Sequence, residues 1–139
     1  MRSIIIADDV RQEINGKEIF IGVYNFSIVF SSFPAFVPKL VLKLTFDLLD
    51  EKDKRFHMEL KDPNGGGVAK YDGEMPSPRS KGEPISLGFI IGPIQIYVEG
   101  RYTIELGVGG ESPEVISDMY VRSPRNDEER SRLHSLFPA

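Results

Sequence analysis

Apolar and polar residues alternate along most of the chain, and the alternation stops near residue 121. Between Leu40 and Leu48 every second residue is apolar, and the same rhythm returns between Tyr102 and Val108. Successive side chains of a strand point to opposite faces, so these segments predict strands with one face in a core. Similar patterns predict strands over residues 3–10, 18–24, 55–60, 68–71, 85–91, 94–98 and 115–121.

Turn-forming residues separate these segments. Asn15-Gly16 predicts a hairpin with a type I′ turn, and the Gly-rich run after Asp62-Pro63 predicts another turn. Gly22, inside a predicted strand, indicates a bulge or a close backbone approach. Residues 31–39 contain Pro34 and Pro38 and are expected to form a loop or a crossover between sheets.

Seven to nine short strands with no helix between them are typical of a sandwich or a barrel. We expect an all-β fold, a two-sheet immunoglobulin-like antiparallel sandwich over residues 1–123. A tail over residues 124–139 should follow, with a helix capped by Asn126 or Asp127 and running to Leu136. Acidic residues in its first turn and arginines later suit the helix dipole.

Composition narrows the function classes. The 139 residues include no cysteine, which excludes disulfides, thiolate metal sites and cysteine nucleophiles. The formal net charge of −4, with basic residues scattered among acids, argues against nucleic acid as a partner. The longest apolar runs are too short for a signal peptide or a membrane span. We therefore expect a soluble, cytoplasmic protein without a membrane partner.

Several segments of the chain serve as landmarks: Ala7-Asp8-Asp9, Asn15-Gly16-Lys17 leading to Phe20-Ile21-Gly22-Val23-Tyr24, the loop from Phe33-Pro34 to Pro38, Asp62-Pro63-Asn64-Gly65, and Gly100-Arg101-Tyr102-Thr103-Ile104-Glu105-Leu106. In these landmarks the chain resembles a family of small uncharacterised bacterial and phage proteins catalogued as a domain of unknown function. The resemblance spans about residues 3–121 and implies a β-sandwich. It implies no activity. The chain departs from the usual pattern in lacking a cysteine near the opening strand and in its charged tail.

Asp8 and Asp9 form the sharpest acidic pair. One hypothesis makes them a cation site together with Asp47, Asp50 or Asp53, because hard cations prefer clustered oxygen ligands. The simpler interpretation is a strand exit with solvated or backbone-capping carboxylates. No EF-hand spacing is present, so the sequence assigns no metal.

No catalytic constellation is visible either. His57 and His134 are the only histidines, and no serine lies in a Gly-x-Ser-x-Gly elbow. Both histidines are expected at the surface. The Gly65-Gly66-Gly67 turn could bind an anion through backbone N–H groups, but a strand and not a helix follows it, which favours a hairpin turn. The sequence implies no cofactor.

Two loops offer candidate binding residues. Phe33 precedes Pro34 and Phe36 lies between Pro34 and Pro38, where they would form an exposed apolar patch for a partner or plug one end of the sandwich. Arg79 and Lys81, with neighbouring serines, could clasp an anion, although a solvated loop explains them more simply.

The favoured function is therefore a non-enzymatic binding or accessory module that recognises a protein partner through loops or a sheet edge. The alternatives are a protein that sequesters a nucleotide or another anion, and a structural subunit of a homo-oligomeric or phage assembly.

Overall fold

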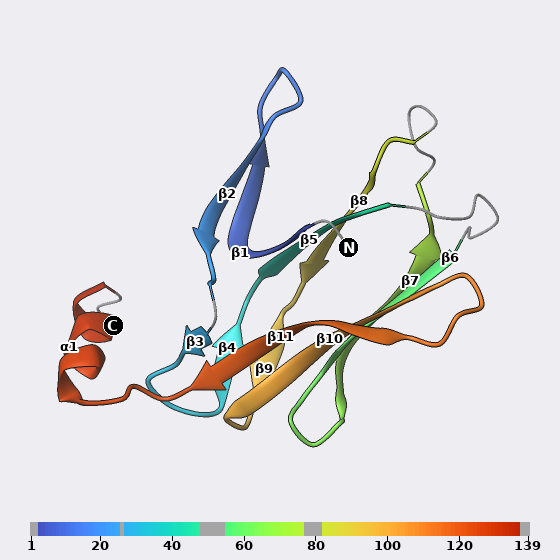
Figure 1. Ribbon diagram of the computed structural model, residues 1–139. Coiled ribbons are helices and arrows are strands. Elements are labelled where there is room, and N and C mark those ends of the chain that lie inside the picture. The colour runs from blue at the N-terminus through green and yellow to red at the C-terminus, as the bar shows by residue number, and fades with distance from the viewer. Residues whose placement is uncertain (1–2, 26, 48–54, 77–81, 137–139) are drawn as a thin grey trace.

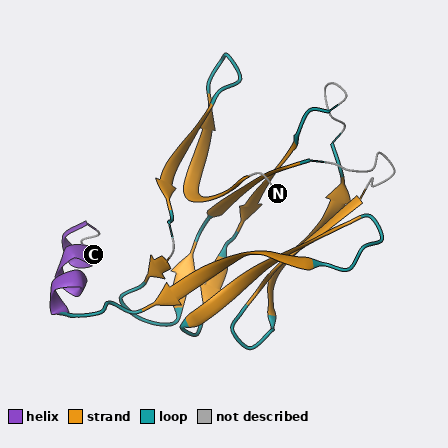
Figure 2. Cartoon of the chain, in the orientation of Figure 1, coloured by secondary structure: helices purple, strands orange, loops and turns teal. Residues whose placement is uncertain are grey.

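The computed structural model describes residues 3–25, 27–47, 55–76 and 82–136, with the backbone alone for residues 133–136. Within these residues the chain forms eleven strands and one C-terminal helix (Figure 1, Figure 2). The strands make two larger sheets and one two-stranded sheet. The prediction of a β-rich fold with a short C-terminal helix is confirmed, with more strands than the seven to nine expected.

The four-stranded sheet has the order β2-β1-β5-β8 and is antiparallel throughout. Its strands are β1 (Ser3–Gln12), β2 (Glu18–Val23), β5 (Leu40–Phe46) and β8 (Ile85–Ile91). At its centre, Leu44 lies opposite Ile4 on one side and Leu87 on the other. This row of apolar side chains points to the interior.

The five-stranded sheet has the order β3-β11-β10-β6-β7. Its strands are β3 (Ser27–Val29), β6 (Arg55–Lys61), β7 (Gly67–Glu74), β10 (Gly100–Val108) and β11 (Glu114–Arg122). The expectation of a purely antiparallel fold is wrong at one pair, since β3 runs parallel to β11. The reason is connectivity: the chain crosses from β2 in one sheet to β3 at the edge of the other.

The small sheet pairs β4 (Ala35–Val37) with β9 (Ile94–Ile96). Residues 31–39 were expected to be a loop or a crossover, and β4 lies within them. The prolines flank the three paired residues and so take no part in the ladder.

One hydrophobic cluster unites the two larger sheets. The predicted faces of the two strongest alternating segments are buried in it: Leu40, Leu42, Leu44, Phe46, Tyr102, Ile104 and Leu106. Met58 and Leu60 of β6 join them and are fully buried. Leu48, also predicted for this face, lies outside the described residues.

The turn of the β1–β2 hairpin differs from the prediction. Glu13 N–H donates to the carbonyl of Lys17 at 2.8 Å, which leaves three loop residues and not two. Gly16 has a φ of 82°, whereas among the described residues only glycines have positive φ. A type I′ turn would need positive φ at Asn15 as well, so this prediction is wrong; a three-residue loop with its last residue in the left-handed region replaces it.

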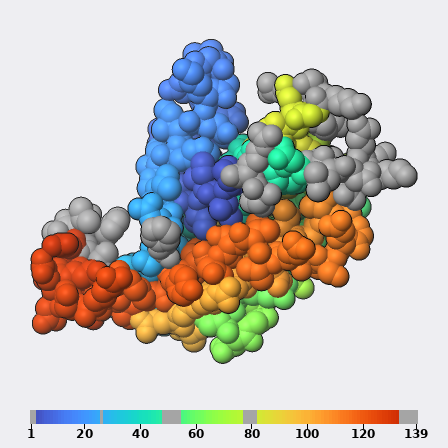
Figure 3. Space-filling model, in the orientation of Figure 1, coloured from blue at the N-terminus to red at the C-terminus, as the bar shows by residue number. Residues whose placement is uncertain are grey.

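The hairpin rises from the body as an arm. β1 pairs with β5 only through Ser3 to Ala7, bends, and continues with β2 alone (Figure 1, Figure 3). An ion pair of 2.9 Å between Lys43 Nζ and Glu18 Oε1 ties the arm to β5.

The helix α1 (Asp127–Leu136) begins as predicted, because the Asn126 side chain accepts a hydrogen bond from Glu129 N–H at 2.9 Å. Arg122, at the end of β11, pairs with Glu129 at 2.5 Å, and Arg130 donates to the carbonyl of Ser31 at 3.3 Å. The division at residue 123 stays a prediction.

Candidate functional site

A pocket of about 370 Å³ opens between the two larger sheets, beside the crossing from β2 to β3. Its walls come from β1, β3, β4, β5, β9 and β11 and from the segments next to them. The volume lies within the roughly 300–1,000 Å³ of small-ligand sites.

The path of the chain explains this opening. β1 leaves β5 after Ala7, so the start of β5 at Leu40 pairs with β8 on one side and with no described strand on the side of β1. β2 then ends at Val23, and the chain moves to β3 on the opposite sheet. The interior is consequently uncovered where β1 bends away, and the small β4–β9 sheet forms another wall of the opening.

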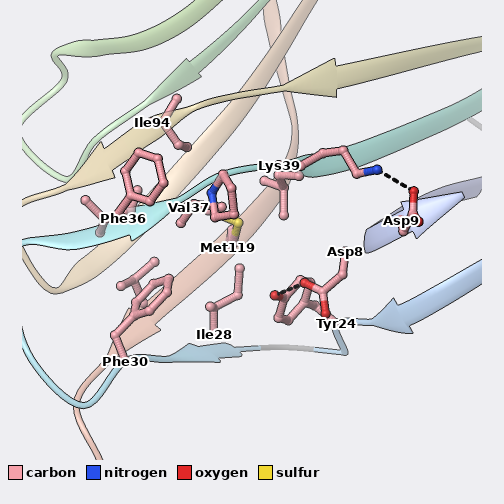
Figure 4. Close-up of a pocket in the computed structure, with 14 residues that line it drawn as sticks. Asp8, Asp9, Tyr24, Ile28, Phe30, Phe36, Val37, Lys39, Ile94 and Met119 are labelled. Carbon is pink, nitrogen blue, oxygen red and sulfur yellow. Dashed lines mark hydrogen bonds and ion pairs between the residues drawn. The ribbon is translucent and has the colours of Figure 1, made fainter. Parts of the chain in front are cut away.

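Most of the pocket wall is apolar. The apolar lining residues are Ile28, Phe30, Phe36, Val37, Pro38, Leu40, Ile94, Ile96, Met119 and Val121. In Figure 4 the side chains of Phe30, Phe36 and Ile94 gather at one end of the pocket. Such a wall favours an apolar guest because it removes apolar surface from water.

Two polar pairs stand at the other end (Figure 4). In the first, the Tyr24 hydroxyl donates a hydrogen bond to Asp8 Oδ1. Burial and this bond to a carboxylate raise the pKa of Tyr24 above its ordinary value, so Tyr24 is a neutral donor at physiological pH.

A glycine makes room for the first pair. Gly22 lies opposite Asp8 in the hairpin with a φ of 67°, and a Cβ there would collide with the Asp8 carboxylate. The close approach predicted at Gly22 is therefore present, and it holds the Asp8 side chain against β2.

In the second pair, Lys39 Nζ donates to Asp9 Oδ1 at 2.5 Å. The same oxygen accepts from Val10 N–H at 2.9 Å, and Arg11 Nε lies 3.8 Å from Asp9 Oδ2. The hydrogen bond from Lys39, then that from Val10, lowers the pKa of Asp9 below its ordinary value. The charge of Asp9 is thus compensated within the protein.

The predicted aromatic loop contributes to the pocket in part. Phe36 lines it and is 61% exposed, so it lies at the entrance. Phe33 is half-buried and packs edge-on against Phe30, with ring centroids 6.0 Å apart. The structure therefore places Phe36 at the surface and Phe33 against the core.

The predicted acidic pair is brought to the pocket, and Asp9 caps the backbone N–H of Val10, as the simpler interpretation allowed. Asp8 contacts Tyr24, and Asp9 contacts Lys39. Asp50 and Asp53 lie outside the described residues. Among the residues that are described, no group of three or more His, Cys, Asp or Glu side chains could hold a metal ion.

The candidate anion-binding residues fall into two groups. Arg79 and Lys81 lie outside the described residues. The glycine turn joins β6 to β7 as a hairpin, and the Asp62 carboxylate accepts hydrogen bonds there from Asn64 and Gly66 N–H. Those two amide donors are therefore already occupied.

His57 lies on β6, half-exposed, with Nδ1 2.6 Å from Asp72 Oδ1 on β7. The described residues place no serine hydroxyl in a hydrogen bond with it. The side chain of His134 is not among those described.

Sequence reasoning missed Tyr24, Lys39, Ile94 and Met119 as members of one site. They come from four segments between residues 24 and 119, and only the sheet topology brings them together. One signal was available: Gly22 in a predicted strand indicated a close contact, which the Asp8 side chain across the hairpin makes.

The fold and the pocket define a β-sheet protein with an amphipathic, ligand-sized opening between its sheets. A family model described as Family of unknown function (DUF6941) matches residues 2–121, and the chain belongs to this family. The sequence-based expectation of a family of unknown function is confirmed.

The comparisons with curated proteins and with solved structures gave no match. Nowhere in the described part of the chain is a helix both long enough and apolar enough to cross a membrane.

Proposed function

We propose that the protein is a non-enzymatic binding module that recognises a partner protein through the pocket between its sheets. The observation that carries this proposal is the opening itself, which is apolar inside and has the exposed Phe36 at its entrance. Large apolar side chains seated in such pockets supply much of the binding energy of protein interfaces.

The strand order supports an immunoglobulin-like sandwich for this module. The pairing of β5 with β8, and of β10 with both β6 and β11, matches the B–E and C–F–G pairings of that fold. Tyr102, near the start of β10, donates its hydroxyl to the carbonyl of Val98 at 2.8 Å, in the manner of a tyrosine corner. Sandwiches of this kind serve many recognition roles.

The edge strand β2 adds a second contact surface beside the pocket. Ile19, Ile21 and Val23 are between 43% and 52% exposed and lie on one face of β2. β2 is at the end of its sheet, so its outer backbone groups are available to an added strand. A partner segment paired with β2 could place a side chain in the pocket.

A pull-down from the native host tests the proposal. Ile94→Trp would project an indole into the pocket, and Ile14→Trp, at the 108%-exposed arm tip, is the matched control. We expect a stoichiometric partner with the wild type and with Ile14→Trp, and its loss with Ile94→Trp. Capture that is unaffected by Ile94→Trp would rule out the pocket as the recognition site.

The pocket volume also favours a second candidate, a protein that sequesters a small ligand. The sequence suggested a nucleotide or another anion for this role, although the entrance carries two carboxylates and one lysine. A thermal-shift panel of nucleotides decides the point, because a tight ligand raises the apparent stability by mass action. No change in Tm across the panel would end this candidate.

The host and the location of the module belong to the proposal as well. The family resemblance suggests a bacterial or phage protein, and the sequence suggests the cytoplasm. Cell fractionation followed by immunodetection checks the second statement, and recovery in a membrane or secreted fraction would contradict it.

A further inference from the structure

Among the described side chains that line the pocket, carboxylates outnumber basic groups. Three ionisable side chains other than tyrosine line the pocket: Asp8, Asp9 and Lys39. Lys39 is engaged with Asp9 at 2.5 Å, and Arg11 lies on the far oxygen of the same carboxylate. Asp8, by contrast, makes no ion pair with any residue in the described part of the chain; its partner is the neutral Tyr24 hydroxyl.

The geometry holds this uncompensated carboxylate at the boundary between the apolar and polar ends. Tyr24 fixes Asp8 Oδ1 from one side, and the backbone of Gly22 lies beneath the side chain. A carboxylate can accept several hydrogen bonds, and one from Tyr24 leaves capacity for a further donor. Asp8 is exposed, so a ligand group can reach it without displacing protein atoms.

When the apolar part of a ligand fills the apolar end of the pocket, the group that follows it therefore lies close to the negative charge of Asp8. An anionic group at that point would be repelled by Asp8, while a cationic group would gain a charge-assisted hydrogen bond. Lys39 does not reverse this preference, because Asp9 already neutralises it.

We propose that the pocket binds a partner segment in which an apolar side chain is followed by a basic one, with the apolar group in the pocket and the cation on Asp8. This inference rests on the proposed function, since it specifies the chemistry of the protein segment that the pocket takes. The exposed β2 edge beside Asp8 gives such a segment a backbone to pair with.

Three capped peptides test the charge preference: acetyl-Leu-Leu-Lys-amide, acetyl-Leu-Leu-Gln-amide and acetyl-Leu-Leu-Glu-amide. Their dissociation constants are measured from chemical shifts of the pocket amides in NMR titrations. We expect the Lys peptide to bind about fivefold more tightly than the Gln peptide, in line with a solvent-exposed ion pair, and the Glu peptide to bind most weakly.

Asp8→Asn keeps the shape of the side chain and an acceptor for Tyr24, so it should abolish the difference between the three peptides. Asp72→Asn, at an exposed carboxylate on β7, is the matched control and should preserve the difference. In the wild type, 0.5 M salt should shrink the gap between the Lys and Glu peptides, because ions screen exposed charges.

Equal affinities for the three peptides, or no pocket shifts with any of them, would overturn the charge preference. The proposed function has its own criterion. A host partner that is lost with Ile94→Trp but binds Asp8→Asn with the wild-type dissociation constant would leave the pocket as a recognition site and refute the basic segment alone.

Discussion

The two sheets meet at two edges, and the edges are built differently. At the edge where β7 and β8 lie, aromatic rings fill the gap: Phe89 packs against Phe56 with centroids 5.4 Å apart and against Tyr71 at 5.7 Å. The Tyr71 hydroxyl also donates to the carbonyl of Ile90 at 3.1 Å. We call this the closed edge.

At the opposite edge, where β2 and β3 lie, the pocket stays open. The aromatic rings there pack against the wall or face solvent: Phe30 contacts Phe33, and Phe36 is largely exposed. We call this the open edge. The core is thus filled by side chains where the edge strands β7 and β8 face each other. It leaves a pocket where the chain crosses from β2 in one sheet to β3 in the other.

The largest expected effect is on the closed edge. Phe89→Ala removes a buried ring that is 7% exposed and leaves a cavity, so it should lower the free energy of unfolding by about 3–5 kcal/mol. Phe36→Ala, at the open edge, should change it by less than about 0.5 kcal/mol. Urea denaturation of both variants checks the contrast, and comparable losses would show that the open edge is packed as tightly as the closed one.

A larger side chain should also destabilise the closed edge more than the open edge, by a smaller amount than Phe89→Ala. Ile85→Trp forces an indole into β8, where the isoleucine is 2% exposed, and should destabilise by about 1–3 kcal/mol. Ile94→Trp has the empty pocket in front of it and should cost less than about 1 kcal/mol. Thermal unfolding measures both, and a greater loss for Ile94→Trp would contradict the open cavity.

Gly22→Ala tests what positions the polar end of the pocket. The added Cβ meets Asp8 and the positive φ strains any residue but glycine, so we expect a loss of about 1–2 kcal/mol.

Gly16→Ala is the matched control, since Gly16 also has positive φ but nothing lies within 4 Å of an added Cβ. It should show the strain alone, and the difference between the two variants in urea denaturation reports the Asp8 contact. Equal losses of unfolding free energy would mean that the Asp8 side chain moves away from the added Cβ without cost.

Much of the fold could be predicted from the local sequence pattern, because a strand with one buried face alternates apolar and polar residues. β5 and β10 are examples, with Leu42 and Ile104 where the alternation placed them. β4 left no such trace, since three residues between prolines are too few to alternate visibly.

The site depended on register, which local pattern did not fix. A two-residue turn at Asn15-Gly16 would place Asp8 opposite Val23, whereas the three-residue loop places it opposite Gly22. A shift of one residue changes every cross-strand neighbour. The acidic pair was therefore recognised as notable, but its contacts with Tyr24 and Lys39 required the three-dimensional structure.

The smallest expected effect on stability concerns the helix α1, which is attached near the open edge through the ion pair of Arg122 and Glu129 (Figure 1). The hydrogen bond from Arg122, followed by that from Arg125 N–H, lowers the pKa of Glu129 from 4.5 to about 2. Because the folded-state pKa is depressed, this contact stabilises the helix above about pH 4.5 and the stabilisation is lost as the pH falls toward 2.

NMR titration of the Glu129 carboxyl carbon should follow this low pKa, and Arg122→Ala should raise the pKa toward 4.5. Arg132→Ala, which removes the partner of Glu128, should leave the Glu129 titration unchanged. Over the same acid range the ring contacts of Phe89 should persist, because the closed edge is held by apolar packing that does not titrate. If the Phe89 contacts are lost at the same pH as the helix, the two edges unfold as one unit. The open edge would then have no acid-sensitive unfolding of its own.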